Sequence, residues 1–528
     1  MILLIGSGAT VEADNHLSLP WRFMRRSLPA AWHGSATGTF CLFLGVYCFM
    51  NNLSHFAAAA EPAGASLLFT SQDPTVVQAR QLIEKGNLSQ AEALLKESGG
   101  DSPASLEGLE IISRIRRDFS QSQEQLLARL RQSIPSITAD DLSRWTAAGQ
   151  VQSRLIDGKL AYFGREPANM WRFCGEAKER RTAPKTEEGW TLESHIARVI
   201  AEAKKTGRRQ VVPIRHRVHY TLTVSPDAPG LKQGAVVRVW LPYPQEYRQQ
   251  SDVKLISTSP AGAFVAPSAA GEYPLSGTPQ RTIYFEQKMS DAKAPLVFKE
   301  LVEFTSSAWY PILEDSQAKP LPADWQGGSL GERPPHIVFT PGIRKTVAQI
   351  VGSETNPLIN ARKIFHWIDG NIAYNSEMEY STIPSLCTKA FTTRRGDCGV
   401  QTMLFVTMCR CAGIPARWQS GWETKRVSHD MHDWCEIYID PWGWLPCDPS
   451  YGLRKSDDPT IREFYLGHQD SYRMIVNRDY GCQLNPPKQS LRSEPLDFQR
   501  GEVEIDGKNL YFQYWDYDEK FEWLSEGP

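Results

Sequence analysis

The sequence predicts a multidomain α+β protein in which an N-terminal helical region and a β-sandwich domain precede a core of mixed helices and strands. Apolar residues recur at helical spacing in the first third of the chain and at alternate positions in the middle third. The length of 528 residues also exceeds what one hydrophobic core usually organises. We therefore expect several domains.

The helical region is predicted over residues 70–185. Its first part, "PTVVQARQLIEKGNLSQAEALLKE", contains two amphipathic segments separated at "KGN" and resembles one helix pair of the tetratricopeptide type. No second copy follows at a fixed period, so a repeat array is not predicted. The stretch "SITADDLSRWTAAGQ" opens with capping residues and predicts another helix. The Asp157-Gly158 pair that follows predicts a tight hairpin.

Strand patterns dominate residues 210–330. Runs such as "RHRVHYTLTV", "AVVRVWLPYP" and "VFKELVEFTSS" alternate apolar and polar residues and are separated by Pro, Gly and Ser clusters, which predicts an Ig-like β-sandwich. Residues 335–486 mix helical and strand patterns and form the predicted core. Residues 490–528 contain a second Asp-Gly pair, Asp506-Gly507, and predict a C-terminal β-hairpin tail.

Residues 1–60 predict an export signal with an oddity at its start. The basic stretch "RFMRRS" precedes the apolar run "TFCLFLGVYCFM" and the small-residue stretch "HFAAAAEPAGA". Translation starting at Met24 would make the first 23 residues an overcalled extension. The apolar run is shorter than the roughly 20 residues that span a bilayer. We expect a protein cleaved near Glu61, with no membrane span afterwards, in the periplasm, cell envelope or extracellular space; an uncleaved anchor is the alternative.

Composition narrows the classes of partner. A formal net charge of −2 gives no field that would attract nucleic acid. Loss of Cys41 and Cys48 with the signal leaves eight of the ten cysteines, too few for a disulfide scaffold, although one or two bridges stay open. The chain has no C-x-x-C pair, so neither a structural metal nor a cofactor is predicted.

The stretch "RRGDCGVQTMLFVTMCRCAGIPAR" carries the candidate nucleophile. A helix is predicted from Cys398, with Asp397 as its N-cap and Gly413 as its stop. Cys398 then lies in the first turn, where free N–H groups and the helix dipole favour a thiolate. Gly399 is expected to leave room for a substrate backbone. Cys409 and Cys411 lie at the far end, where the dipole disfavours a thiolate and buried, inert thiols are expected.

The candidate base and its orienting acid lie in "HDWCEIYIDPWGWLPCDP". This stretch alternates like two strands and turns near Asp440, so a hairpin centred there would place His432 directly opposite Asp448. A carboxylate beside an imidazole fixes the tautomer that presents a free nitrogen to a nucleophile. Each residue alone is more often an ordinary strand or turn residue; the ordered set favours catalysis.

The order "RGDCG" and then "HDWCEIYI…GWLPCDPSYG" resembles the core of the transglutaminase-like superfamily, which has a papain-like Cys–His–Asp fold. By position, Cys398 matches the nucleophile, His432 the base and Asp448 the orienting acid. The packing positions of the two strands in the pattern are matched by Trp434, Glu436, Trp444 and Pro446. The chain departs from the pattern at Cys435 and Cys447, where apolar residues usually stand; a diagonal bridge or plain core packing are both open. The flanking domains resemble those of exported bacterial members.

The chemistry implied is acyl transfer at a peptide or carboxamide carbonyl through a thioester on Cys398. The Cys398 N–H is one expected oxyanion donor, and Tyr374 is the candidate for a second, preferred over Trp367. Water as acceptor gives a cysteine peptidase or amidase acting on a protein or peptide, which is the predicted function. A lysine amine would instead give a protein-crosslinking transglutaminase, but the chain lacks a calcium-ligand run of the D-x-D-x-D-G kind.

A second class of function stays open. The chain could be a non-catalytic binding module of the cell envelope, in which the three residues are a remnant and the helical region docks a protein partner. The intact order of Cys398, His432 and Asp448 favours the enzyme, although fold alone would not.

Overall fold

The structure is a computed structural model that describes residues 66–97, 102–182, 191–271, 275–290, 296–426 and 429–526. The predicted signal at residues 1–60 lies outside the described residues. From Glu61 onward the chain forms one compact unit. The predicted fold class is confirmed, since a helical region, antiparallel sheets and a mixed core follow one another along the chain.

The N-terminal part of this unit is helical and contains one hairpin. Its elements are α1 (Leu67–Thr70), α2 (Pro74–Glu84), α3 (Leu88–Glu97), α4 (Pro103–Asp118), α5 (Gln123–Arg131), α6 (Ala139–Ala147), β1 (Ser153–Ile156), β2 (Lys159–Tyr162), α7 (Met170–Phe173) and α8 (Gly175–Arg180). The caps follow the sequence: Asp73 accepts two N–H groups at the start of α2, and Thr138 and Asp141 form a capping box at α6. The predicted hairpin turns at Asp157-Gly158, both with positive φ.

Two antiparallel sheets pack face to face and form the second body of the fold. One sheet has the order β16-β15-β4-β7-β6 and the other β17-β3-β8-β5. The strands are β3 (Gln210–Val224), β4 (Val236–Pro242), β5 (Gln250–Ser259), β6 (Phe264–Val265), β7 (Thr282–Lys288), β8 (Leu296–Trp309), β15 (Glu502–Ile505), β16 (Lys508–Leu510) and β17 (Trp515–Glu526). Alternate residues of β3 and β8 are buried in the shared apolar core. The Ig-like topology stays a prediction.

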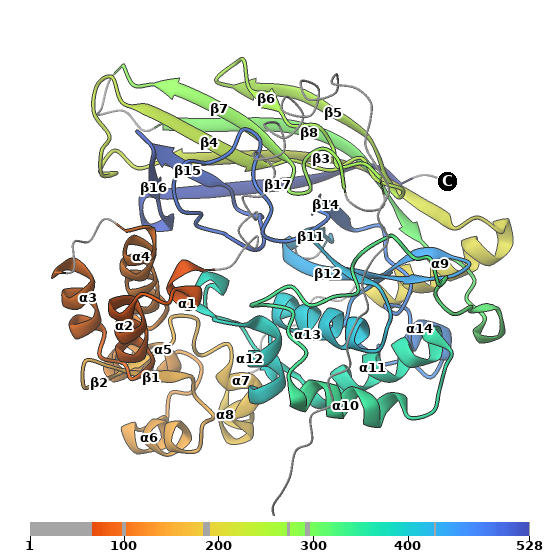
Figure 1. Cartoon of the computed structure of the whole chain (residues 1–528), viewed down its shortest axis with the longest axis horizontal. Coiled ribbons are helices and arrows are strands. Elements are labelled where there is room, and N and C mark those ends of the chain that lie inside the picture. Colours follow the sequence, from red (N-terminus) through yellow and green to blue (C-terminus); the bar gives the residue numbers. More distant parts are fainter. Residues whose placement is uncertain are drawn as a thin grey trace, which may run out of the picture. The chain divides into compact units, whose positions relative to one another are not determined.

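The C-terminal strands belong to this sandwich. β15 pairs with β4 and with β16, whose hairpin turns at Asp506-Gly507, while β17 lies along nearly the whole of β3. Figure 1 shows the blue strands β15–β17 among the green strands β4, β7 and β8. The residues predicted to form a C-terminal hairpin tail therefore contribute strands to both sheets. Alternation predicts strands but does not specify their partners.

The third body holds the candidate site. Its elements are α9 (Leu192–Thr206), η1 (Asp315–Gln317), α10 (Pro341–Val351), α11 (Pro357–Asn371), β9 (Ala373–Tyr374), η2 (Tyr380–Thr382), α12 (Leu386–Thr393), β10 (Arg395–Gly396), α13 (Cys398–Cys411), β11 (Ala416–Thr424), β12 (His429–Ile439), β13 (Gly443–Cys447), α14 (Pro459–Arg462) and β14 (Arg473–Asn477), with η3 (Phe512–Tyr514) in the sandwich. A sheet of order β13-β12-β11-β14 packs against the almost wholly buried helix α13.

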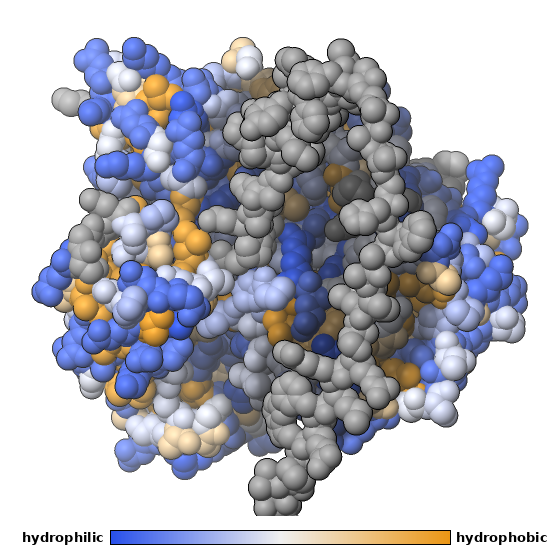
Figure 2. Space-filling model, viewed as in Figure 1, coloured by the Kyte–Doolittle hydropathy of each residue, from blue (hydrophilic) through white to orange (hydrophobic). Residues whose placement is uncertain are grey.

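The face of the molecule in Figure 2 is largely hydrophilic, with apolar residues in separate patches. Among the residues that the structure describes, no helix combines the length and the apolar character needed to cross a bilayer.

Candidate active site

Cys398 is the first residue of α13. The Asp397 carboxylate accepts the Val400 N–H at 3.1 Å, so Asp397 is the N-cap that the sequence predicted. A parallel pairing of β9 with β10 leads the chain into this helix and sets Gly396 beside Tyr374. The start of the helix is thus fixed by its own cap and by a neighbouring strand, which holds the Cys398 side chain at a defined place.

The surroundings of the Cys398 thiol are acidic. Its Sγ atom donates to Oδ2 of Asp433 at 3.4 Å, and the residue is 9% exposed. Burial raises the pKa of the thiol well above its usual range, and the charges of Asp433 and Asp397 raise it further. The expectation that a thiolate is favoured at rest is therefore wrong, because the helix N-terminus is outweighed by burial and by two carboxyl groups.

Tyr380 joins these two carboxyl groups beneath the helix start. Its hydroxyl lies 2.7 Å from Oδ1 of Asp397 and 3.1 Å from Oδ2 of Asp433, and it accepts the Gly399 N–H at 3.1 Å. One hydroxyl has one proton, so when Tyr380 donates to Asp397 its second contact is a hydrogen bond only if Asp433 is protonated. Burial and the charge of Asp397 indeed raise the pKa of Asp433 to about 7.

The space beside Gly399 is occupied. A β-carbon on this residue would lie 2.7 Å from Oδ2 of Asp433 and closer still to the Tyr380 hydroxyl. The expectation that Gly399 leaves room for a substrate backbone is therefore wrong; the glycine makes room for Tyr380.

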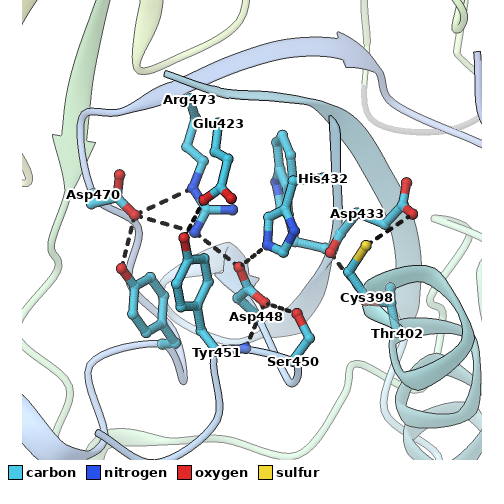
Figure 3. A network of polar contacts seen from close by, with 12 residues as sticks. Cys398, Thr402, Glu423, His432, Asp433, Asp448, Ser450, Tyr451, Asp470 and Arg473 are labelled. Carbon is cyan, nitrogen blue, oxygen red and sulfur yellow. Dashed lines mark hydrogen bonds and ion pairs between the residues drawn. The ribbon is translucent and has the colours of Figure 1, made fainter. Parts of the chain in front are cut away.

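His432 and Asp448 are in direct contact. Nε2 of His432 lies 2.7 Å from Oδ2 of Asp448, and both side chains are buried. Figure 3 shows the imidazole of His432 between Asp448 on one side and the side chain of Cys398 on the other. When Nε2 carries the proton and donates it to Asp448, Nδ1 is the free base of the ring.

The hairpin register differs from the predicted one. The last pair of the hairpin is Ile439↔Gly443, so its centre is Pro441 instead of Asp440. Asp448 consequently follows the end of β13 and lies diagonal to His432 rather than directly opposite. Both residues still share one face because their separation is even. The hydrogen bond joins His432 in β12 to the first residue beyond β13.

A buried arginine contacts the same oxygen of Asp448 as His432 does. Arg473, from β14, places Nη2 2.9 Å from Oδ2 of Asp448 and 3.2 Å from Oδ2 of Asp470. Against the opposing effect of burial, His432 and Arg473 lower the pKa of Asp448 well below its usual range. Ser450 Oγ and the Tyr451 N–H donate to its other oxygen at 2.9 and 3.1 Å. Asp448 is thus an ionised, fully bonded partner for His432.

Cys398 opens into a cavity of about 150 Å³ that Tyr374 also lines. The Tyr374 ring lies under the guanidinium of Arg172, 4.4 Å from its centroid. Trp367 instead stacks on Phe391 and does not line this cavity. The structure therefore brings Tyr374 to the same space as Cys398, as the preference over Trp367 requires.

Several residues of the site carried no signal in the sequence. Gln499 donates to the His432 carbonyl and to Oδ1 of Asp433, both at 2.9 Å, and Arg500 and Asp497 line the same cavity. They come from the segment before β15, about 100 residues beyond Cys398. Asp433 stood inside the recognised stretch, but at a position that the family pattern leaves unspecified.

The cysteines in the described part of the chain are free thiols; Cys409 is buried as expected, whereas the expectation of a buried thiol is wrong for Cys411, which is half-buried at the helix end. Cys435 and Cys447 form a directly opposed pair in β12 and β13, where Cys435 Sγ donates to the Cys447 carbonyl at 3.4 Å. Both are buried in the main apolar core, so core packing holds and a diagonal bridge is wrong. In the described ranges no group of three or more His, Cys, Asp or Glu side chains could hold a metal ion.

Comparison with protein families finds a match for the core of the chain. Residues 344–449 match the transglutaminase-like superfamily. The chain is 30% identical over 214 residues to an uncharacterized protein of Haemophilus influenzae, covering 34% of this chain and 57% of that protein. It is 28% identical over 185 residues to the uncharacterized protein YebA of Bacillus subtilis, covering 31% of this chain and 22% of that one. The chain thus spans about a fifth to somewhat over half of these curated relatives.

Solved structures give a fainter likeness. A candidate cysteine protease from Cytophaga hutchinsonii aligns with a TM-score of 0.40 and 16% identity, over 60% of this chain and 92% of that one. The periplasmic domain of TgpA from Pseudomonas aeruginosa aligns with a TM-score of 0.23 and 14% identity, over 51% of this chain and 95% of that one.

Proposed function

Because the chain carries a transglutaminase-like core, we propose that it is a cysteine acyl-transfer enzyme that hydrolyses peptide or amide bonds through a thioester on Cys398. One observation carries the proposal: the imidazole of His432 is bonded to buried Asp448 and lies between it and the Cys398 side chain, which lines one cavity with Tyr374. A nucleophile, a base and an orienting acid are the groups that this chemistry needs.

The reaction starts from a neutral thiol. Nδ1 of His432 takes the Cys398 proton as Sγ attacks the carbonyl carbon, and the imidazolium that forms is stabilised by ionised Asp448. The oxyanion is bonded by the Cys398 N–H and by the Tyr374 hydroxyl. Collapse breaks the C–N bond, and His432 gives its proton to the leaving amine. Water then attacks the thioester, His432 takes one of its protons, and the acid leaves as the thiol is restored.

The acyl acceptor decides between two activities. We propose water, since no calcium-ligand run of the D-x-D-x-D-G kind accompanies the core. A lysine amine would make the enzyme a crosslinking transglutaminase, and an inert site would leave an envelope-binding module.

A single incubation tests the proposal. The chain from Glu61 onward, Cys398→Ala and the matched control Cys411→Ala, at the far end of the same helix, are mixed with glutamine-containing peptides and a small primary amine. We expect cleaved or deamidated peptides, by mass, from the wild type and from Cys411→Ala. Amine-tagged glutamine would instead indicate a transglutaminase. If no product depends on Cys398, the result contradicts an enzymatic function.

We also propose that the protein is exported, on the basis of the basic stretch, the short apolar run and the small residues within residues 1–60. N-terminal sequencing of the protein purified from its own cells would show a start near Glu61. A start at Met1 or Met24 would contradict cleavage there.

A further inference from the structure

The helical region contacts the segment that leads to Tyr380. Asn169, which precedes α7 and is 2% exposed, accepts the Ser376 N–H at 2.6 Å and donates to the Ser376 carbonyl at 2.9 Å. Both backbone polar groups of one residue are thus bonded by one buried amide. This pairing fixes the Ser376 peptide as a neighbouring strand would.

A second contact lies three residues further along. The Asp118 carboxylate, at the end of α4, accepts the Glu379 N–H at 3.0 Å. Arg165, also from the helical region, lies 3.6 Å from the Glu379 carboxylate. The residue after Glu379 is Tyr380, whose hydroxyl bonds Asp397, Asp433 and Gly399.

We propose that the helical region is part of the catalytic unit, with Asn169 as a positioning residue that acts on Cys398 through Ser376 and Tyr380. The inference deepens the proposed function and rests on it for its catalytic meaning. It gives the helical region a role inside the chain, beside any docking of a partner. Asn169 touches no reacting atom; it sets where Tyr380 stands, and Tyr380 sets the two carboxyl groups around the thiol.

The test uses a readout that needs no substrate. Iodoacetamide alkylates Cys398 at a rate that follows its thiolate fraction, and peptide mass separates this site from the other cysteines. The rate is measured from pH 6 to pH 10 for the wild type, Asn169→Ala, Tyr380→Phe and the double variant. Ile134→Val is the control, because it removes one methylene from the core of the same helical region.

Asn169→Ala and Tyr380→Phe are each expected to change the alkylation rate at pH 7 by about threefold or more and to shift its pH midpoint, with the double variant no further changed than Tyr380→Phe alone. Ile134→Val should leave rate and midpoint at the wild-type values. If Asn169→Ala does not fold, Asn169→Asp replaces it, since aspartate keeps the acceptor for the Ser376 N–H and loses the donor.

An unchanged pH profile in Asn169→Ala, or additive effects in the double variant, would overturn the inference. Turnover is measured in parallel. If the effects of the two substitutions on alkylation are coupled but the wild type hydrolyses no peptide, the positioning role stands and the proposed hydrolysis is contradicted. The two failures are therefore distinguishable.

Discussion

At the scale of single residues, burial and two neighbouring carboxyl groups keep Cys398 protonated. Asp433 bonds the thiol, and Tyr380 connects Asp433 with Asp397. Both carboxyl groups disfavour a thiolate. In the reaction that we propose, activation therefore depends on proton transfer to His432 at the moment of attack, and not on a preformed ion pair.

Asp433→Asn tests this electrostatic account. The amide oxygen can still accept from Gln499 and the amide nitrogen can donate to the Tyr380 oxygen, but the side chain has no charge and no longer accepts the Cys398 proton. Because the Asp433 charge raises the pKa of the thiol, the pH midpoint for alkylation of Cys398 should fall by on the order of one unit. An unchanged or higher midpoint would show that Asp433 is neutral throughout the range or does not act on the thiol.

The same variant should alter the pH dependence of stability. The folded pKa of Asp433, about 7, is above its ordinary value. A raised carboxyl pKa contributes stability that is present below the ordinary pKa of about 3.9 and is lost as pH rises through about 7. The free energy of unfolding of the wild type, measured in urea, should therefore fall between pH 4 and pH 7 relative to that of Asp433→Asn. Parallel curves for the two proteins would contradict this shift.

Arg473 is the counter-charge of a buried pair of carboxylates. Arg473→Met leaves Asp448 and Asp470 without it, so the free energy of unfolding at pH 7 should fall by about 3–5 kcal/mol. The lowered pKa of Asp448 contributes stability that is present above its ordinary pKa and lost as pH falls toward the folded value. The difference between the two proteins should accordingly shrink in acid, as urea titrations at pH 7 and pH 3 would show.

At the scale of elements, the start of α13 is packed as tightly as a core. Replacing a glycine inside a helix by alanine ordinarily stabilises the helix by about 1 kcal/mol. Gly399→Ala should instead destabilise the protein and lower turnover, because its β-carbon meets Tyr380 and Asp433. Gly370→Ala, in α11 with nothing within 4 Å of its β-carbon, is the control and should stabilise. Equal shifts in melting temperature would contradict the packing argument.

The sequence predicted these elements better than their registers. Capping residues and Gly413 define α13 locally, so its start and end follow from a few neighbouring residues. The offset between β12 and β13 depends on which residues the turn encloses, and a shift of the centre from Asp440 to Pro441 left the periodicity unchanged. Parity was predictable for His432 and Asp448, whereas direct opposition was not.

At the scale of the whole molecule, residues far apart in sequence complete one site. Arg473 and Tyr380 come from elements of the third body that lie about 90 residues apart, and Gln499 comes from the segment before β15. A local pattern cannot identify such partners, because each is an ordinary residue until the fold sets it beside Cys398 or Asp448. The triad candidates were predictable because they lie within one recognisable stretch of the core.

Glu436 ties the core to the sandwich. It is fully buried, accepts from Nε of Arg417 at 2.8 Å and from the Tyr247 hydroxyl at 3.0 Å, and also pairs with Arg248. Glu436→Gln leaves two guanidinium groups without their counter-charge, so the free energy of unfolding should fall by about 3–5 kcal/mol.

Glu303→Gln provides the matched control for that substitution. Glu303 also pairs with two arginines, Arg215 and Arg217, but near the surface of the sandwich. Its loss should cost about 1 kcal/mol or less. Equal losses in the two variants, measured by urea unfolding, would show that the Glu436 cluster is no more important to stability than a surface pair.

The proposed function depends on a thioester at Cys398, which the intact mass of the protein during turnover would reveal. The chain from Glu61 onward is mixed with glutamine-containing peptides, quenched in acid within the first turnovers and weighed. We expect an acyl adduct that maps to Cys398, disappears with hydroxylamine and is absent from Cys398→Ala. Product formation by the wild type without any such adduct, or an adduct that persists in Cys398→Ala, would contradict the proposed thioester.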